Sequence, residues 1–84
     1  MPDRAMELRH LAQADRHIRE GERREHVVQG AIDRSVALNM NADHARVLLL
    51  LIGDGIAAIK AHRLLILRSI DDIDRRGVAT QTPD

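Results

Sequence analysis

Proline stands only at positions 2 and 83 of this 84-residue chain, so residues 3–82 contain none of the strongest helix breaker. Within that span the only stretch with turn chemistry is Leu38-Asn39-Met40-Asn41, because asparagine tolerates the left-handed backbone conformation and can cap a helix. No strand is visible on either side of it. The sequence therefore predicts an all-α fold in which a short turn makes two long helices antiparallel neighbours, a helical hairpin. Their predicted bounds are about residues 4–38 and 42–76.

The first predicted helix has an amphipathic pattern. Its aliphatic residues are spaced by three, four or seven positions, which places them on one face, with Ala14 and Gly21 filling gaps. The opposite face is charged and carries pairs four residues apart, such as Glu20–Arg24, each worth a few tenths of a kcal/mol. Asp3 is the expected N-cap, and Asn41 or Asp43 is expected to cap the second helix. The aliphatic stripe consists of Leu8, Leu11, Ile18, Val28, Ile32 and Val36.

The second predicted helix is apolar on nearly all sides between Val47 and Leu67. A helix of that kind is normally buried by neighbours on several sides, and its hairpin partner covers only one face. We therefore expect self-association, as a homodimer in which two hairpins form a four-helix bundle with the second helices at its centre. The predicted interface residues are Leu48, Leu51, Ile52, Gly55, Ile56, Ile59, Leu65 and Ile66.

The chain is short enough to form one domain at most, and a single core of that size is marginally stable. It contains no cysteine, so no disulfide can compensate, and no Phe, Tyr or Trp, so the core is wholly aliphatic. Gly77 and the polar residues after it are predicted to end the second helix. The tail at 77–84 is expected to be disordered.

Charge and hydropathy argue against several partners. Thirteen basic residues balance thirteen acidic ones, whereas nucleic-acid and anionic-membrane binding rest on clustered Lys and Arg. The aromatic side chains on which single-stranded nucleic acid stacks are absent. The longest apolar run, Val47–Ile52, is far shorter than the roughly 20 residues that span a bilayer, and no secretory signal is visible at the start of the chain. We expect a cytoplasmic protein that binds neither nucleic acid nor membrane.

The stretch Gly53-Asp54-Gly55 interrupts the apolar run. It is no phosphate loop, because no strand precedes it and no Gly-Lys-Ser/Thr follows it. The apolar stripe keeps its register across it, so we expect a continuous helix. The glycines then mark a close helix crossing, a hinge, or mere tolerance of a weak spot, and we favour the crossing. With the turn as a pivot near residue 40, residues 25–27 face residues 53–55.

Five histidines raise the question of a metal site. His10 and His17 share a face, the pivot places His17 near His62, and Glu7-x-x-His10 has the spacing found in carboxylate-bridged metal bundles. Such bundles need further glutamates, and the second helix has none. Zinc on His17, His62 and a nearby Asp is a weak candidate. We predict no metal and no cofactor, and we expect the histidines to be solvated or to lie at helix boundaries.

Two segments, HLAQADRHIREGERR at residues 10–24 and AHRLLIL at residues 61–67, resemble a group of short uncharacterised helical proteins of α-proteobacteria. In that group a first helix carries HLAxAxRHIxxGExR, a turn similar to GHDT follows, and a second helix carries an alanine, a leucine pair and a late HRxxIL. Here the alanine is Ala45 and the leucine pair is Leu48-Leu49. The resemblance spans about residues 8–67 and implies a helical hairpin without a known activity.

The chain departs from that pattern at two places. Glu25 stands where the group usually has an aliphatic residue, and the Gly53–Gly55 pair has no counterpart. An inward carboxylate needs a cationic partner or water. We expect Glu25 to lie at a wet edge of the bundle, with Arg24, His26 and His62 as the cations within reach.

These observations predict a small self-associating interaction and assembly module, with the charged face of its first helix open to an unidentified protein partner. We expect no enzyme, because the hydroxyl candidates Ser35, Ser69, Thr80 and Thr82 lie in no nucleophile elbow and beside no histidine. Two alternatives stay open, a DNA-associated regulatory protein and a His-containing metal-binding helical bundle. Balanced charge and the lack of a short helix-turn-helix argue against the first.

Overall fold

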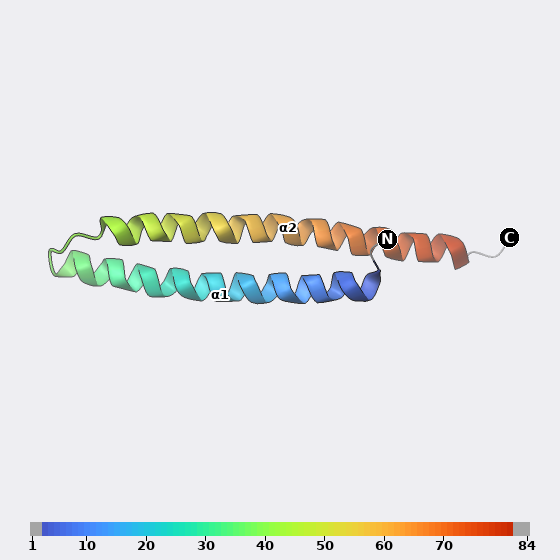
Figure 1. The fold of residues 1–84 in the computed structure, drawn as a ribbon, viewed down its shortest axis with the longest axis horizontal. Coiled ribbons are helices and arrows are strands. Elements are labelled where there is room, and N and C mark those ends of the chain that lie inside the picture. Colours follow the sequence, from blue (N-terminus) through green and yellow to red (C-terminus); the bar gives the residue numbers. More distant parts are fainter. Residues whose placement is uncertain (1–2, 82–84) are drawn as a thin grey trace.

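The chain folds into two long helices that lie side by side (Figure 1). The computed structural model describes residues 3–81, and within them helix α1 spans Arg4–Ala37 and helix α2 spans Asp43–Gln81. The helices run antiparallel and form a rod of 74 × 16 × 14 Å. The predicted all-α helical hairpin is confirmed, and so is the position of its turn.

The capping residues set the ends of α1. Asp3 has an extended backbone, and its carboxylate accepts a hydrogen bond of 2.7 Å from the Met6 N–H, as an N-cap does. At the other end Asn39 adopts a left-handed conformation with φ 55°. Its N–H donates to the Val36 carbonyl at 3.1 Å, and the Met40 N–H donates to the Ser35 carbonyl at 2.7 Å. This is the hydrogen-bond pattern of a Schellman motif.

Helix α2 begins beside a second asparagine. The Asn41 side chain accepts a hydrogen bond of 2.8 Å from the Asp43 N–H, which satisfies one of the unpaired donors of the first turn. The helix then continues through Gly53-Asp54-Gly55, so the predicted continuity is confirmed.

The predicted end of α2 differs from the structure. Gly77 lies inside the helix, which continues to Gln81. No described glycine has a positive φ, so Gly77 does not adopt the left-handed conformation that would end the helix. The helix therefore ends about five residues later than predicted, at Gln81. The expected disorder of the tail stays a prediction, and residues 82–84 lie outside the described residues.

In each helix, one row of residues faces the other helix. Successive residues of the row are alternately three and four positions apart in the sequence. Such a row follows a seven-residue repeat, as in a coiled coil. In α1 the row is Glu7, Leu11, Ala14, Ile18, Gly21, Glu25, Val28 and Ile32; in α2 it is Ala45, Leu49, Ile52, Ile56, Ile59, Arg63, Ile66 and Ile70. Leu8 and Val36, predicted for this stripe, are exposed instead, because they lie one position outside the row.

Polar contacts between the helices define their register. Asp15 lies opposite Arg63 and Arg4 opposite Asp74, so residue i of α1 faces residue 78 − i of α2. The predicted pivot at residue 40 is therefore off by one, which moves every facing residue by two positions. The shift matters at the glycines, because it brings Glu25 to Gly53 and leaves Gly55 away from α1.

Candidate interaction surface

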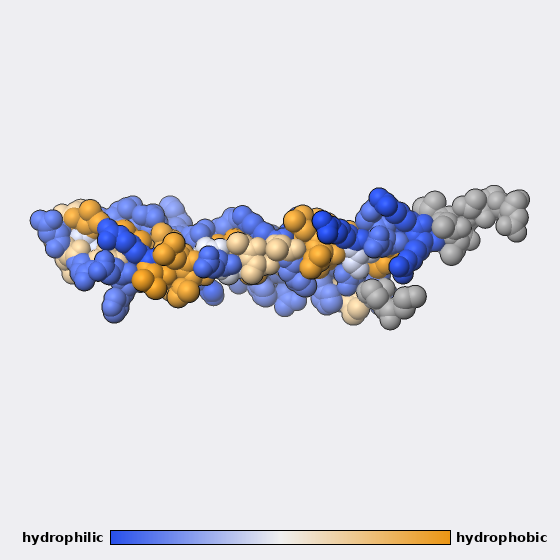
Figure 2. All heavy atoms as spheres, turned by 90° about the horizontal axis from the view of Figure 1, so that it is seen from above, coloured by the Kyte–Doolittle hydropathy of each residue, from blue (hydrophilic) through white to orange (hydrophobic). Residues whose placement is uncertain are grey.

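The face of α2 that points away from α1 is apolar and exposed. Viewed from that side, Figure 2 shows two apolar patches along the rod with a paler stretch between them. Leu50, Leu51 and Leu65 expose 70%, 62% and 58% of their surface, respectively. The other large exposed side chains of this face are Val47, Leu48, Leu64 and Leu67. Isolated exposed leucines are ordinary, whereas large apolar side chains gathered on one face are typical of surfaces that bind another molecule.

The exposed face repeats every seven residues. Leucine pairs at 50–51 and 64–65 flank an alanine pair at 57–58. Seven residues make close to two helical turns, so the three pairs stack on one side of α2. Charged or polar pairs, Asp43-His44 and Asp71-Asp72, end the stripe on both sides. The apolar surface therefore ends inside α2 on both sides and covers only the middle of this helix.

A groove runs along one edge of the hairpin, between the two helices. It consists of three neighbouring depressions that share His17 and Ile59 at one junction and Arg24 and Ile52 at the next. We refer to it as the edge groove. Its lining residues include His10, Ala14, His17, Gly21, Arg24 and Val28 from α1, and Leu48, Ile52, Gly55, Ile56, Ala58, Ile59 and His62 from α2.

One glycine, Gly21, lies at a close contact between the two helices. The sequence pattern had indicated only that it occupies a gap in the aliphatic stripe of the first helix. A Cβ atom built on Gly21 would lie 2.7 Å from Cγ1 of Ile56, closer than real contacts come. A Cβ atom on Gly53 would lie an ordinary 3.5 Å from Oε2 of Glu25, and one on Gly55 would meet nothing within 4 Å. Within the hairpin the crossing expected at Gly53–Gly55 is therefore wrong, because the register puts Gly21 at the contact.

The predicted interface residues divide into two groups. Ile52, Ile56, Ile59 and Ile66 point toward α1, and Ile56 and Ile66 are buried in the hairpin at 6% and 4% exposure. Leu48, Leu51, Gly55 and Leu65 are exposed. Apolarity alone cannot separate these groups in a helix that is apolar all round. The four exposed positions are the ones available to a second molecule.

Glu25 is half-buried and faces Gly53. Among the residues that the structure describes, it has no hydrogen-bond or ion-pair partner, and none of the expected cations reaches it. The missing side chain at Gly53 leaves space beside the carboxylate, which water can fill.

Three of the five histidines lie at the edge groove. His10, His17 and His62 line the same depression, so the expected proximity of His17 and His62 is present. His10 Nδ1 lies 3.4 Å from Oε1 of Glu7, whose side chain is buried. Over residues 3–81, however, no three His, Cys, Asp or Glu side chains lie close enough together to hold a metal ion.

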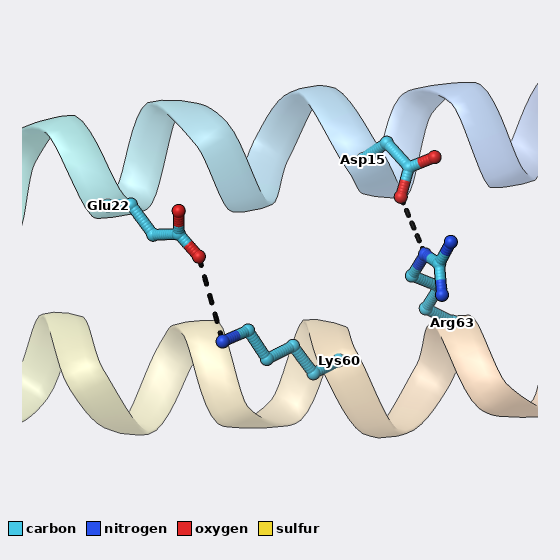
Figure 3. A network of polar contacts seen from close by, with 4 residues as sticks. All are labelled: Asp15, Glu22, Lys60 and Arg63. Atoms are coloured by element: carbon cyan, nitrogen blue, oxygen red, sulfur yellow. Dashed lines mark hydrogen bonds and ion pairs between the residues drawn. The ribbon is translucent and has the colours of Figure 1, made fainter.

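Ion pairs cross the opposite edge of the hairpin (Figure 3). Asp15 accepts a 2.6 Å hydrogen bond from Arg63 Nε, and Lys60 Nζ lies 3.6 Å from Glu22. Both pairs are partly exposed, so each contributes at most about 1 kcal/mol. This edge also has a depression, which Ile18, Ala61 and Leu64 line beside the Asp15–Arg63 pair, so neither edge of the hairpin is closed.

No protein family, curated protein or solved structure matches the chain. In the part of the chain that the structure describes, neither helix has a stretch that is both long and apolar enough to cross a bilayer. The resemblance to short α-proteobacterial helical proteins stays a prediction.

Proposed function

We propose that the protein is a self-associating helical module whose role is assembly and protein interaction, with no catalytic step. Two hairpins associate through the exposed apolar face of α2 into a four-helix bundle. Helix α1 then lies outside, and its charged face is open to a partner protein. The observation that carries the proposal is the bounded run of exposed leucines and alanines from Val47 to Leu67.

The weakness of the hairpin's own core supports this proposal. Among the described residues, no large side chain is fully buried, and the buried apolar residues are Ala14, Ile32, Ala42, Ile56 and Ile66. Two of these are alanines, which bury little area. Each leucine removed from water contributes about 1.5–3 kcal/mol, so covering the outer leucines would add stability comparable to the hairpin's own core.

The surface area supports the same proposal. The chain exposes 6660 Å², whereas a compact protein of its mass exposes about 5,000 Å². The surplus of about 1,600 Å² follows from the thin rod shape. It exceeds the roughly 800 Å² that each partner contributes to an interface of standard size.

The test is the mass of the full chain in solution, measured by light scattering at micromolar concentration. We expect a mass of at least twice 9.4 kDa. Leu51→Glu should weaken association about 100-fold or more, because it would place an unpaired charge in the interface. The hairpin itself should remain helical, because Leu51 is exposed within one chain.

Arg19→Glu is the matched control, because Arg19 is exposed on α1 and also gains a carboxylate. It should leave the mass unchanged. A single-chain mass for the unaltered protein at tens of micromolar, with full helicity, would contradict the proposal.

A further inference from the structure

We propose that two copies pair α2 against α2 in antiparallel orientation, about a two-fold axis that passes between Gly55 and Ala58. This inference rests on the proposed self-association and specifies its geometry. The contact row, which we name the outer row, consists of Leu48, Leu51, Gly55, Ala58, His62 and Leu65.

The outer row has the spacing of a helix-packing row. Its members follow one another at steps of three and four, and all six are exposed in the hairpin. The row lies about a quarter of a turn around α2 from the row that contacts α1. That angle is the one a helix needs when it packs against two neighbours in a four-helix bundle. It also borders the edge groove, where Leu48, Gly55 and His62 form one rim.

The side-chain sizes along the outer row fit a pair of helices that cross at the middle of the row. Gly55 and Ala58 are central, and a Cβ on Gly55 would meet nothing within 4 Å. Helix backbones approach most closely where side chains are small, and the larger residues pack on both sides of that point. In the antiparallel pair Leu48 lies against Leu65 of the second copy, and Gly55 lies against Ala58 of the second copy.

Charge favours the antiparallel orientation over the parallel one. In a parallel pair the dipoles of the two α2 helices would point the same way, which is unfavourable. Antiparallel pairing places Asp54 beside Ala61 and Arg68 beside Val47 of the second copy. It also sets the two α2 dipoles in opposition, which is the favourable arrangement.

The unequal ends of the hairpin favour the same orientation. Arg4, at the start of α1, pairs with Asp74, and α2 continues beyond that point to Gln81 (Figure 1). At the other end of the rod the turn exposes Leu38 and Met40, at 70% and 62%. In the antiparallel pair, residues 71–75 of α2 lie level with the turn of the second copy, residues 38–42, so the exposed Leu38 and Met40 gain a neighbour.

The test uses disulfide formation, which the chain allows without background because it contains no cysteine. The double variant Leu48→Cys/Leu65→Cys is oxidised mildly, at a concentration where light scattering gives a dimer. We expect most of it to become a covalent dimer. Within one chain the two positions are about 25 Å apart along the helix, too far for a disulfide, which needs Cα atoms within roughly 7 Å.

The single variants Leu48→Cys and Leu65→Cys are the controls, and each should stay uncrosslinked. In the antiparallel pair, each cysteine lies about 25 Å from its own copy. Crosslinking of both single variants would show a parallel pair and overturn the inference. A dimer in which the double variant stays uncrosslinked would show that another face is used, and would also overturn it. A mass in solution equal to that of one chain would instead contradict the proposed function itself.

Discussion

Small residues decide how closely the two helices of this hairpin approach. Gly21 receives the side chain of Ile56, and Ala14 is buried further along the same row. Opposite Glu25, the missing side chain at Gly53 leaves room for a carboxylate that has no partner among the described residues. The glycines of α1 and α2 therefore have different roles, and substitutions separate them.

Gly21→Ala and Gly53→Ala form a matched pair. Both gain up to about 1 kcal/mol of helix propensity. At Gly21 the new methyl group would meet Cγ1 of Ile56 at 2.7 Å, and overpacking of that kind costs about 1–3 kcal/mol. We expect Gly21→Ala to lower the melting temperature measured by circular dichroism, and Gly53→Ala to raise it. Equal shifts for both variants would mean that Ile56 moves aside without cost.

Glu25→Leu should stabilise the protein by about 1 kcal/mol, since apolar residues often replace a poorly paired, partly buried charge with a gain. The free energy of unfolding in urea is the measurement. Glu20→Leu is the control, because Glu20 is exposed and should change stability little. A clear loss of stability in the Glu25 variant alone would reveal a specific partner for this carboxylate.

Helix α1 ends through a backbone arrangement that its neighbouring residues dictate. Asn39 is the described non-glycine residue with a positive φ, and the Schellman hydrogen bonds around it satisfy carbonyls of the last turn of α1. The turn is thereby determined by five residues between the helices.

Asn39→Val should destabilise the hairpin by about 1–2 kcal/mol, because a branched side chain is strained in the left-handed region. Asn39→Gly should be neutral or slightly stabilising, because glycine adopts that region freely. Urea denaturation of the two variants is the comparison. Coinciding midpoints would show that the left-handed turn is not maintained in solution.

The elements were predictable from sequence where local chemistry determines them. The absence of proline, the Asp3 cap and the asparagines at 39 and 41 locate both helices and the turn. Tertiary geometry was harder to predict. The observed register differs by two positions from the one that a pivot at residue 40 predicts, and the close contact is at Gly21, whereas a Cβ on Gly55 would meet nothing within 4 Å. Because α2 is apolar all round, hydropathy cannot show which of its residues face α1.

The whole molecule is a thin rod whose buried residues lie in the two facing rows and, at Ala42, in the turn. A rod two helices wide cannot enclose a side chain on all sides, and no large residue of the described chain is fully buried. Stability in such a molecule depends on what covers the outer face of α2.

The melting temperature should therefore depend on protein concentration, because association stabilises the folded state by mass action. We expect a rise of several degrees between about 1 and 100 μM. Leu65→Glu should abolish this dependence, whereas Arg19→Glu should retain it. A melting temperature that stays constant across the range would show that folding and association are not linked.

The tight fit of Ile56 against Gly21 also bears on an error to which repetitive hairpins are prone. A seven-residue repeat lets one helix slide past the other by two turns and still present a similar row. Such a slip would bring Ile56 to Val28 or Ala14 and would separate Arg63 from Asp15. Only the observed alignment offers Ile56 a position without a side chain. The contact between Gly21 and Ile56 thus opposes sliding of one helix along the other. Neither hydropathy nor helix propensity would assign this role to a glycine.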